Sequence, residues 1–196
     1  MIKINPSNME TIIKNSLENH LRAFKLLEGS QEKIKEIAKL FIFNLRNSGK
    51  IIFIGNGGSA ADAEHLAAEL VGRFKKNRKA YAAISLSSNI CIMTAIGNDY
   101  GFDEIFSRQV EALAQKNDLV VAISTSGESQ NVIKAVVSAK RLGLKTVGFL
   151  GKSGGKLKSL VDLSLLISTE DTPRIQEMHI LAGHIICEIV EEEFSR

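Results

Sequence analysis

Ile51-Ile52-Phe53-Ile54-Gly55-Asn56-Gly57-Gly58-Ser59 is the stretch that decides how this chain is expected to fold. Its four consecutive apolar residues predict a buried strand. A Gly-Asn-Gly-Gly turn and an alanine-rich segment follow, which predict a tight turn into a helix. Glycines let the backbone approach an anion, and the first amides of a helix attract one, so the stretch suits a phosphate. It fits neither a Walker loop nor a G-x-G-x-x-G fingerprint, and the glycines alone leave an ordinary tight turn equally open.

Composition predicts a cytoplasmic globular protein of one domain. A chain of 196 residues suffices for one sizeable α/β domain, and 44% hydrophobic residues predict a full core. The net charge of +3 is interspersed along the chain, which argues against a nucleic-acid partner. No apolar run approaches a membrane span of about 18 residues, and Met1–Asn8 do not resemble a leader. Cys91 and Cys187 lie far apart in apolar segments, where we expect core residues without a disulfide.

The spacing of apolar residues predicts alternating strands and helices. Two amphipathic helices at 8–28 and 31–47 come first, and Ser30 is expected to cap the second. Strands are expected at 50–54, 82–86, 119–123, 145–150 and 163–167. Helices are expected at 59–74, 89–97, 103–115, 129–142 and from Pro173 to Glu193, and a turn at Gly97–Gly101. This order indicates a mostly parallel, doubly wound sheet that binds its ligand at the carboxyl ends of the strands.

A second loop at the same edge of the sheet is rich in hydroxyl groups. Ser124, Thr125, Ser126 and Ser129 follow the third strand and precede a helix. Hydroxyl groups and helix-terminal amides bind a phosphate without a basic residue. A serine-rich loop that only caps a helix is the simpler interpretation of this loop alone. Two such loops on one sheet favour a phosphorylated ligand.

Imidazole and carboxylate groups recur on two of the predicted helices. His65 and Glu69 are four residues apart and share a helix face, where they could hold a divalent metal or transfer protons. Gln176 and His184 are eight residues apart, about 80° beyond two full turns, and therefore point in nearby directions. A solvated His–Glu pair and a core histidine are the simpler interpretations. Spacing alone does not show that the two helices meet.

Taken together, these motifs resemble the sugar isomerase (SIS) domain family, and within it the bacterial phosphoheptose isomerases. The resemblance covers nearly the whole chain. Its segments, in order, are Gly55–Ala63 with His65 and Glu69, Gly97–Asp99, Ser124–Gly127 with Ser129, Gly151–Gly155 and Arg174–His179. Ala60 and Ala61 stand where some of these isomerases have bulkier residues, which leaves the detail of the pocket open.

The resemblance implies a fold, an assembly and a site. The fold is a three-layer αβα sandwich around a five-stranded parallel sheet, one domain over residues 1–196. The assembly is a homotetramer with active sites at subunit contacts, and we expect the helices at 8–47 to take part in these contacts. One zinc ion per subunit is implied, surrounded by His65, Glu69, Gln176 and His184. The sugar phosphate is expected to contact Asn56, Gly57, Gly58, Ser59, Glu69, Asn98, Asp99, Ser124, Thr125, Ser126, Ser129 and Gln176, with its phosphate in the hydroxyl loop.

The implied activity is aldose–ketose isomerisation of sedoheptulose 7-phosphate to D-glycero-D-manno-heptose 7-phosphate through an enediolate. This is the first step toward ADP- or GDP-heptose precursors of surface glycans, and the sequence does not decide between lipopolysaccharide and capsule. Glu69 is the candidate base between C1 and C2, and His184 is the candidate for proton transfer between the oxygens. A side chain bound tightly to zinc is a poor base. Either the ligation is loose or the substrate displaces a ligand, and the sequence leaves both open.

Two other functions fit the same fold. A non-catalytic relative that binds a replication initiator protein resembles this chain at Ser59–Ala61, Thr94–Ile96 and Arg174–His179, but it lacks the acid and the histidine of Glu69 and His184. A sugar-phosphate sensor attached to a transcription factor would need a DNA-binding domain, and none is expected before residue 8. The sequence therefore favours the enzyme.

Overall fold

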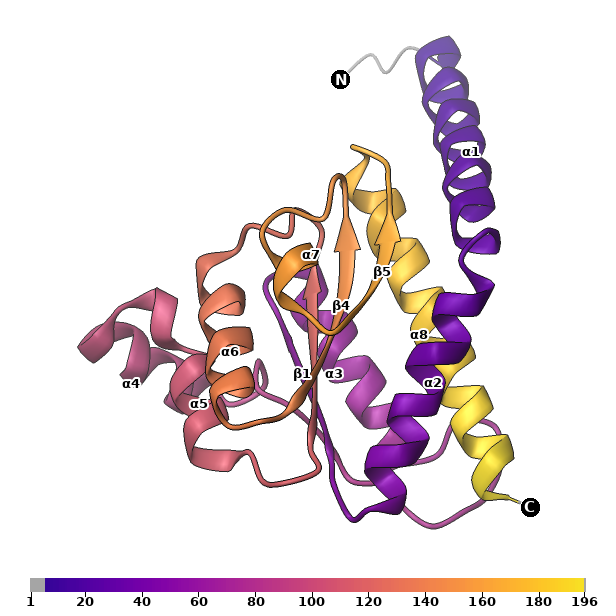
Figure 1. Ribbon diagram of the computed structural model, residues 1–196. Helices are drawn as coiled ribbons and strands as arrows, with labels where there is room; N and C mark the ends of the chain where they lie inside the picture. The colour runs from indigo at the N-terminus through magenta and orange to yellow at the C-terminus, as the bar shows by residue number, and fades with distance from the viewer. Residues whose placement is uncertain (1–5, 196) are drawn as a thin grey trace.

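A five-stranded sheet forms the centre of the computed structural model, which describes residues 6–195 (Figure 1). Its strands are β1 (Ile51–Gly55), β2 (Ala83–Ser85), β3 (Leu119–Ser124), β4 (Lys145–Gly151) and β5 (Leu163–Ile167). Every neighbouring pair is parallel, and the order is β2-β1-β3-β4-β5. The predicted parallel sheet is thus confirmed. The expectation about a leader concerns Met1–Asn8, most of which lies outside the described residues.

The direction in which the strands are added reverses between β1 and β3. β2 follows β1 along the chain and pairs with one side of it, whereas β3, β4 and β5 extend the sheet from the other side. Gly55 at the end of β1 lies opposite Ile123 near the end of β3. The loops after these two strands therefore leave the sheet side by side, at the position where doubly wound sheets bind ligands.

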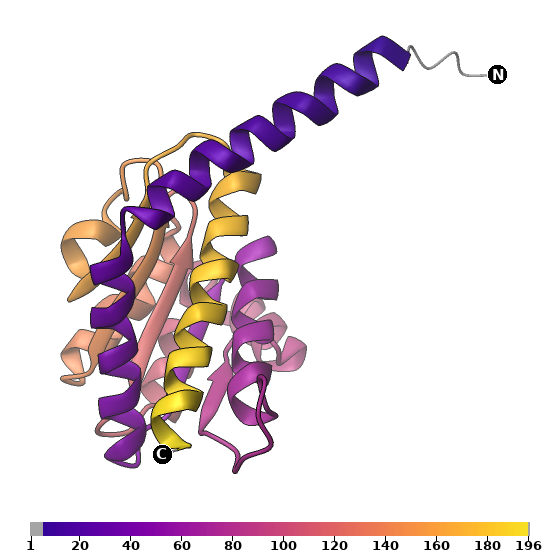
Figure 2. The same ribbon diagram turned by 90° about the vertical axis from the view of Figure 1, so that its right-hand side faces the viewer.

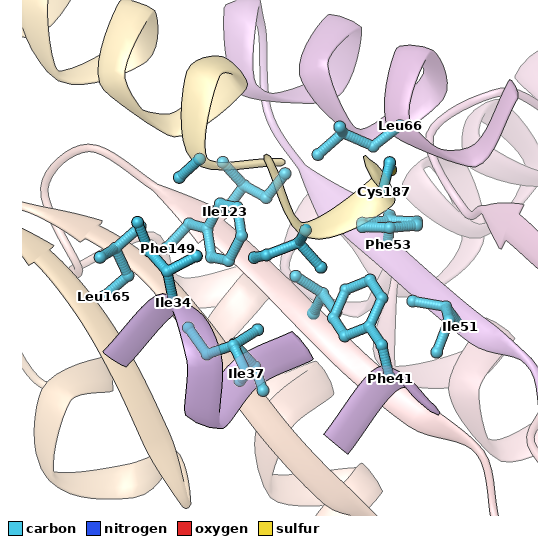
Figure 3. Close-up of a cluster of buried hydrophobic side chains, with 14 of the residues drawn as sticks. Ile34, Ile37, Phe41, Ile51, Phe53, Leu66, Ile123, Phe149, Leu165 and Cys187 are labelled. Atoms are coloured by element: carbon cyan, nitrogen blue, oxygen red, sulfur yellow. The ribbon is translucent and has the colours of Figure 1, made fainter. Parts of the chain in front are cut away.

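One face of the sheet is covered by α2 (Gln31–Arg46), α3 (Gly58–Val71), α8 (Thr172–Phe194) and the end of α1 (Pro6–Glu28). Ile51 and Phe53 of β1 point into this core, whereas Ile52 and Ile54 point into the core on the other face. Burial on both faces explains the unbroken apolar run. In Figure 3, Phe41 and Phe53 lie near each other, with ring centroids 6.1 Å apart. Burying one such side chain stabilises the fold by about 1.5–3 kcal/mol.

The other face carries α4 (Ile90–Tyr100), a 3-10 turn η1 (Phe102–Glu104), α5 (Ser107–Leu113), α6 (Gln130–Arg141) and α7 (Leu157–Leu160). Helix α4 differs from the rest, because none of its eleven residues, all of them described, is buried. Two predictions were wrong here. The expected turn at Gly97–Gly101 is helical up to Tyr100, and Gly101 ends the helix with a φ of +91°. Cys91 is exposed, because α4 projects from the body (Figure 1) and packs on the core through Met93 and Ile96 and not through Cys91.

Helix α1 extends beyond the rest of the molecule (Figure 2). Polar contacts attach it to α8: His20 Nδ1 lies 2.7 Å from Glu177 Oε2, and Arg174 donates to the Ser16 carbonyl at 2.8 Å. Ser30 does not cap α2 as predicted, since its hydroxyl donates to the Leu26 carbonyl one turn earlier. Within residues 6–195, no helix combines the length and the apolar character that crossing a bilayer requires.

Candidate active site

Helices α3 and α8 bring His65, Glu69 and His184 together. His65 Nε2 lies 2.9 Å from His184 Nε2 and 3.3 Å from Glu69 Oε1. The helices approach closely because residue 183 is glycine, and a Cβ there would lie only 2.5 Å from Leu66. Residue spacing could not show whether the two helices are in contact. In the structure they meet at the candidate metal ligands.

This cluster fits a metal ion. One ligand atom from each of His65, Glu69 and His184 lies within 4.8 Å of the other two. Tetrahedral zinc with bonds of about 2.0–2.1 Å separates its ligand atoms by about 3.3 Å, close to the distances in the cluster. Gln176 lies two turns before His184 on α8, and a Cβ on Gly58 would clash with its side-chain amide. Gln176 therefore lies over the start of α3, next to the first loop.

The surroundings of His184 favour its neutral form. Burial and the nearby His65 lower its pKa, against the opposing effect of Glu69. A neutral imidazole can bind a metal or accept a proton. The Phe74 ring stacks on His184 with centroids 5.5 Å apart. The side chain of His65 is 51% exposed, so the cluster is open to solvent on this side.

A buried carboxylate on α8 holds the loop that supports the cluster. Glu191 accepts backbone N–H groups from Phe74, Lys75 and Lys76 at 2.8–3.1 Å, and Arg78 Nε at 2.9 Å. Burial would raise the pKa of Glu191, but these donors together lower it. Arg78 also donates to the Glu69 carbonyl at 2.7 Å. Sequence reasoning missed these residues, since only the packing of α8 against the loop gives them a role.

The hydroxyl loop at Ser124–Ser129 follows β3 and leads into α6. Ser124 Oγ accepts from Gly127 N at 3.1 Å and lies 3.4 Å from Ser129 Oγ, while Ser126 Oγ accepts from Glu128 N at 3.2 Å. These serines therefore also shape the loop. The side chain of Ser129, the N-cap, makes no cap hydrogen bond. The first amides of a helix lack backbone carbonyl partners one turn earlier, which suits an anion, although Val132 N in the first turn of α6 donates to Asn131 Oδ1.

The backbone of the hydroxyl loop interlocks with the loop after β4. Gly127, Gly154 and Gly155 all have positive φ angles, at +69°, +89° and +51°. A Cβ on Gly127 would clash with the Gly154 carbonyl, and one on Gly155 would lie 2.6 Å from Gly127. The Gly127 carbonyl also accepts from Leu157 N at 3.1 Å. Only glycine permits this approach, and the contacts fix the shape of the hydroxyl loop.

Two side-chain amides join the loops after β1 and β3. Asn56 Nδ2 donates to Asn131 Oδ1, and Asn131 Nδ2 donates to Asn56 Oδ1, both at 2.9 Å. Asn131 is 2% exposed. Asn56 was predicted to contact the substrate, and its side chain is engaged here in this reciprocal pair. Asn131 was not singled out from the sequence, where it is one more polar residue at the start of a helix.

Comparison with known proteins decides the family. The model of the SIS domain matches residues 16–151. A phosphoheptose isomerase from Helicobacter pylori is 52% identical over 188 residues, covering 95% of this chain and 98% of its own, and one from Nitratiruptor is 52% identical over 186 residues, covering 95% and 100%. The structure of a phosphoheptose isomerase from Neisseria gonorrhoeae superposes with a TM-score of 0.90 at 39% identity, covering 94% of this chain and 99% of that one. The chain belongs to the phosphoheptose isomerase family of SIS-domain proteins.

Asn98 and Asp99, which were predicted to contact the substrate, lie apart from the other predicted site residues. They are exposed near the end of α4, where Asn98 Nδ2 donates to Asp99 Oδ1 at 2.8 Å. Met93 and Ile96 of the same helix pack on the side of the sheet away from α3 and α8. The first loop and the hydroxyl loop thus leave the sheet at one edge, and the His–Glu–His cluster lies about two to three turns along α3 and α8. Asn98 and Asp99 belong to α4, which projects from the body (Figure 1).

Proposed function

We propose that this chain is an aldose–ketose isomerase that interconverts sedoheptulose 7-phosphate and D-glycero-D-manno-heptose 7-phosphate in the cytoplasm. One observation carries the proposal: α3, which holds two members of the His–Glu–His cluster, begins at the first loop, and the Asn56–Asn131 pair joins this loop to the start of α6 after the hydroxyl loop. Membership of the phosphoheptose isomerase family supports the same substrate. The two unpaired cysteines among the described residues are in keeping with a reducing compartment.

The two loops divide the binding of the substrate between them. The phosphate occupies the hydroxyl loop, where Ser124, Thr125, Ser126, Ser129 and the first amides of α6 surround it. The carbon chain runs from there along Asn56–Ser59 toward Glu69 and Gln176. Open space for the sugar hydroxyls lies beside Gly57, where a Cβ would meet no atom within 4 Å, and the side-chain amide of Gln176 lies beside Gly58.

Proton transfer is the task of the cluster. Glu69 removes a proton from C1 of the ketose and returns it to C2, while His184 takes the proton from the C1 hydroxyl and delivers it to the C2 oxygen. Burial and the nearby His65 lower the pKa of His184, which favours the neutral imidazole that can accept this proton. His65, Glu69, Gln176 and His184 would hold a zinc ion, which when bound polarises the carbonyl group and stabilises negative charge on the oxygens.

Conversion of the substrate tests this function. The purified protein is incubated with sedoheptulose 7-phosphate, with added zinc or with a chelator, and the products are followed by NMR. We expect an aldoheptose 7-phosphate to appear, and to appear more slowly after chelation. A folded protein that converts nothing under either condition would contradict the proposal and would favour the scaffold that binds a replication initiator.

We further propose a homotetramer whose active sites lie at subunit contacts. Apolar side chains along α1 are exposed, without cover from residues 6–195, namely Met9, Ile12, Ile13, Leu17, Leu21, Phe24 and Leu26. An apolar groove between α1, α2 and α8 is lined by Phe24, Leu27, Ile34, Leu181, Ile185 and Ile189. Ile90, Tyr100 and Phe102 are also more than half exposed, next to Asn98 and Asp99. In the proposed assembly, α4 delivers Asn98 and Asp99 to the site of a neighbouring subunit.

Subunit complementation tests the shared site. Glu69→Gln and Asp99→Ala subunits are each expected to be inactive alone. Mixed and reassembled, they should regain part of the activity, because some sites then combine an intact Glu69 with an intact Asp99 from another subunit. Leu17→Asp, which charges the exposed stripe of α1, should reduce the tetramer to smaller species in analytical ultracentrifugation. Complete lack of recovery in the mixture would contradict the shared site.

A further inference from the structure

The Asn56–Asn131 pair joins two parts of the chain that serve different ends of the substrate. Asn56 belongs to the loop that leads into α3, which carries His65 and Glu69. Asn131 is the second residue of α6, which begins at the hydroxyl loop. Each amide donates one hydrogen bond to the other and accepts one from it, both at 2.9 Å. The pair thus bridges the point where the order of the strands reverses.

The Asn56–Asn131 pair is suited to fix the distance between the first loop and the start of α6. Two parallel hydrogen bonds between planar amides resist both sliding and twisting, which a single bond does not. Asn131 is 2% exposed, and its Oδ1 also accepts Val132 N at 2.9 Å, so its side chain is held in one orientation. On the side of α6, the hydroxyl loop is independently shaped by the glycine contacts between Gly127 and Gly154. The amide pair is therefore a direct side-chain link between the two loops, beyond the backbone pairing of β1 with β3.

We propose that Asn131 is a positioning residue for the isomerisation, which through Asn56 sets the span between the bound phosphate and the proton-transferring groups. This inference rests on the proposed function, since it requires the phosphate to lie in the hydroxyl loop. A sugar phosphate is held at one end and reacts at the other. A misplacement of about 1 Å between the two ends can cost about 100-fold in rate while each end still binds.

Kinetics of Asn131→Ala test the proposal, with Asn44→Ala as the matched control. Asn44 is also a buried asparagine, 3% exposed, whose Nδ2 bonds to the Asn117 carbonyl at the opposite edge of the sheet. For Asn131→Ala we expect kcat to fall at least about tenfold. The inhibition constant of inorganic phosphate, which probes the hydroxyl loop alone, should stay unchanged. Asn44→Ala should lose stability and keep both constants.

A second variant retains the shape of the side chain. In Asn131→Asp, a protonated carboxyl group offers one C=O and one O–H and can replace the amide in the pair, whereas the carboxylate offers two acceptors. Burial raises the pKa of a carboxyl group, so the introduced carboxylate should become protonated within the pH range in which kcat is measured. The kcat of this variant relative to the wild type should therefore rise as the pH falls, and that of Asn131→Ala should not.

Three results would overturn the proposal. One is a kcat for Asn131→Ala equal to that of Asn44→Ala in an enzyme that phosphate inhibits. Another is a loss of phosphate affinity in Asn131→Ala as large as its loss of kcat. Asn131 would then maintain the conformation of the hydroxyl loop and would not set its distance from the cluster. Failure of phosphate to inhibit even the wild type would overturn the phosphate placement of the proposed function, and this inference with it.

Discussion

The two ends of the candidate site are built in different ways. At the phosphate end, the hydroxyl loop is one contiguous segment, Ser124–Ser129, whose backbone is shaped by glycines and by its own serines. At the proton-transfer end, the cluster combines His65 and Glu69 of α3 with His184 of α8, which are far apart in the chain. One end depends on local backbone conformation, and the other depends on how two helices pack.

Because the two ends are built differently, they should differ in their sensitivity to pH and to substitution. Backbone amides and hydroxyls bind a phosphate regardless of pH near neutrality, and they are sensitive to any added Cβ in the glycine contacts. Side chains that transfer protons depend on ionisation and on exact chemical identity. We therefore expect substitutions in the cluster to change kcat and metal content, and substitutions in the glycine contacts to change KM.

Glu69→Gln is expected to have the largest effect. Gln keeps the size of the side chain but cannot accept the C1 proton, so kcat should fall about 1,000-fold, within the usual contribution of a general base. The midpoint of thermal unfolding should stay near that of the wild type, since Glu69 lies in a partly open site. Glu64→Gln, an exposed glutamate on the same helix, is the control and should retain full activity. Turnover at the wild-type rate in Glu69→Gln would remove Glu69 from the mechanism.

His184→Ala is next. The variant should bind less than one zinc per subunit in elemental analysis, and kcat should fall more than about 100-fold, since even a residue that only supports a ligand contributes about 10- to 100-fold. His20→Ala is the matched control, because His20 contacts Glu177 outside the cluster. Unchanged zinc content in His184→Ala would exclude it as a ligand.

Gly127→Ala probes the other end. The added methyl group would clash with the Gly154 carbonyl, so the hydroxyl loop must shift and KM should rise about tenfold, equivalent to about 1.4 kcal/mol. Gly143→Ala isolates the effect of backbone strain, because Gly143 has a φ of +74° but open space around its Cβ position. This control should lose about 1–2 kcal/mol of stability without a change in KM. Equal KM values for the two variants would break the distinction between the ends.

The last prediction concerns the pH dependence of stability and leaves the kinetics of the site unchanged. His179 is fully buried, and its Nε2–H donates to the Leu150 carbonyl at the end of β4, beside the hydroxyl loop. Burial lowers the pKa of His179 from 6.5 to about 4. Between these values the unfolded chain binds a proton that the folded chain excludes, so this contribution to stability is complete above about pH 6.5 and is lost as the pH falls toward 4.

The free energy of unfolding should therefore fall by up to about 3 kcal/mol over this range. Burial raises the pKa of Asp62 to about 6, so protonation of Asp62 increases stability as the pH falls. This opposing effect is the same in the wild type and in the His179→Gln variant. In His179→Gln, which retains an N–H donor, urea unfolding should show a weaker decline toward acid than the wild type. An identical pH profile would contradict the role assigned to His179.

The same difference explains how much of the site could be predicted from the sequence. The first loop, the hydroxyl loop and the alternation of strands and helices along the chain follow from local patterns, and the structure has them where they were expected. The meeting of α3 and α8 depends on Gly183 against Leu66, which no spacing rule predicts. Asn56 and Asn131 are 75 residues apart, so their pairing follows only from the side-by-side exit of two strands.

The wrong predictions have a related cause. Cys91 and its apolar neighbours in α4 follow the pattern of a core helix, but this chain leaves them exposed. Apolar periodicity indicates that a face will be covered, without indicating whether the cover comes from the same chain. The stripe along α1 raises the same question, and the pattern of apolar residues in one sequence does not separate the two cases.

Isomerisation in deuterated water tests the central claim most directly. The wild type and Glu69→Gln are incubated with sedoheptulose 7-phosphate under identical conditions, and the carbon-bound protons are followed by NMR. We predict that the wild type forms an aldoheptose 7-phosphate that carries deuterium at C2, because the base exchanges its proton with solvent, and that Glu69→Gln forms almost none. Product without deuterium at C2 would show that the base does not exchange its proton with solvent. Equal product formation by both proteins would contradict the role of Glu69 and with it the account of the site.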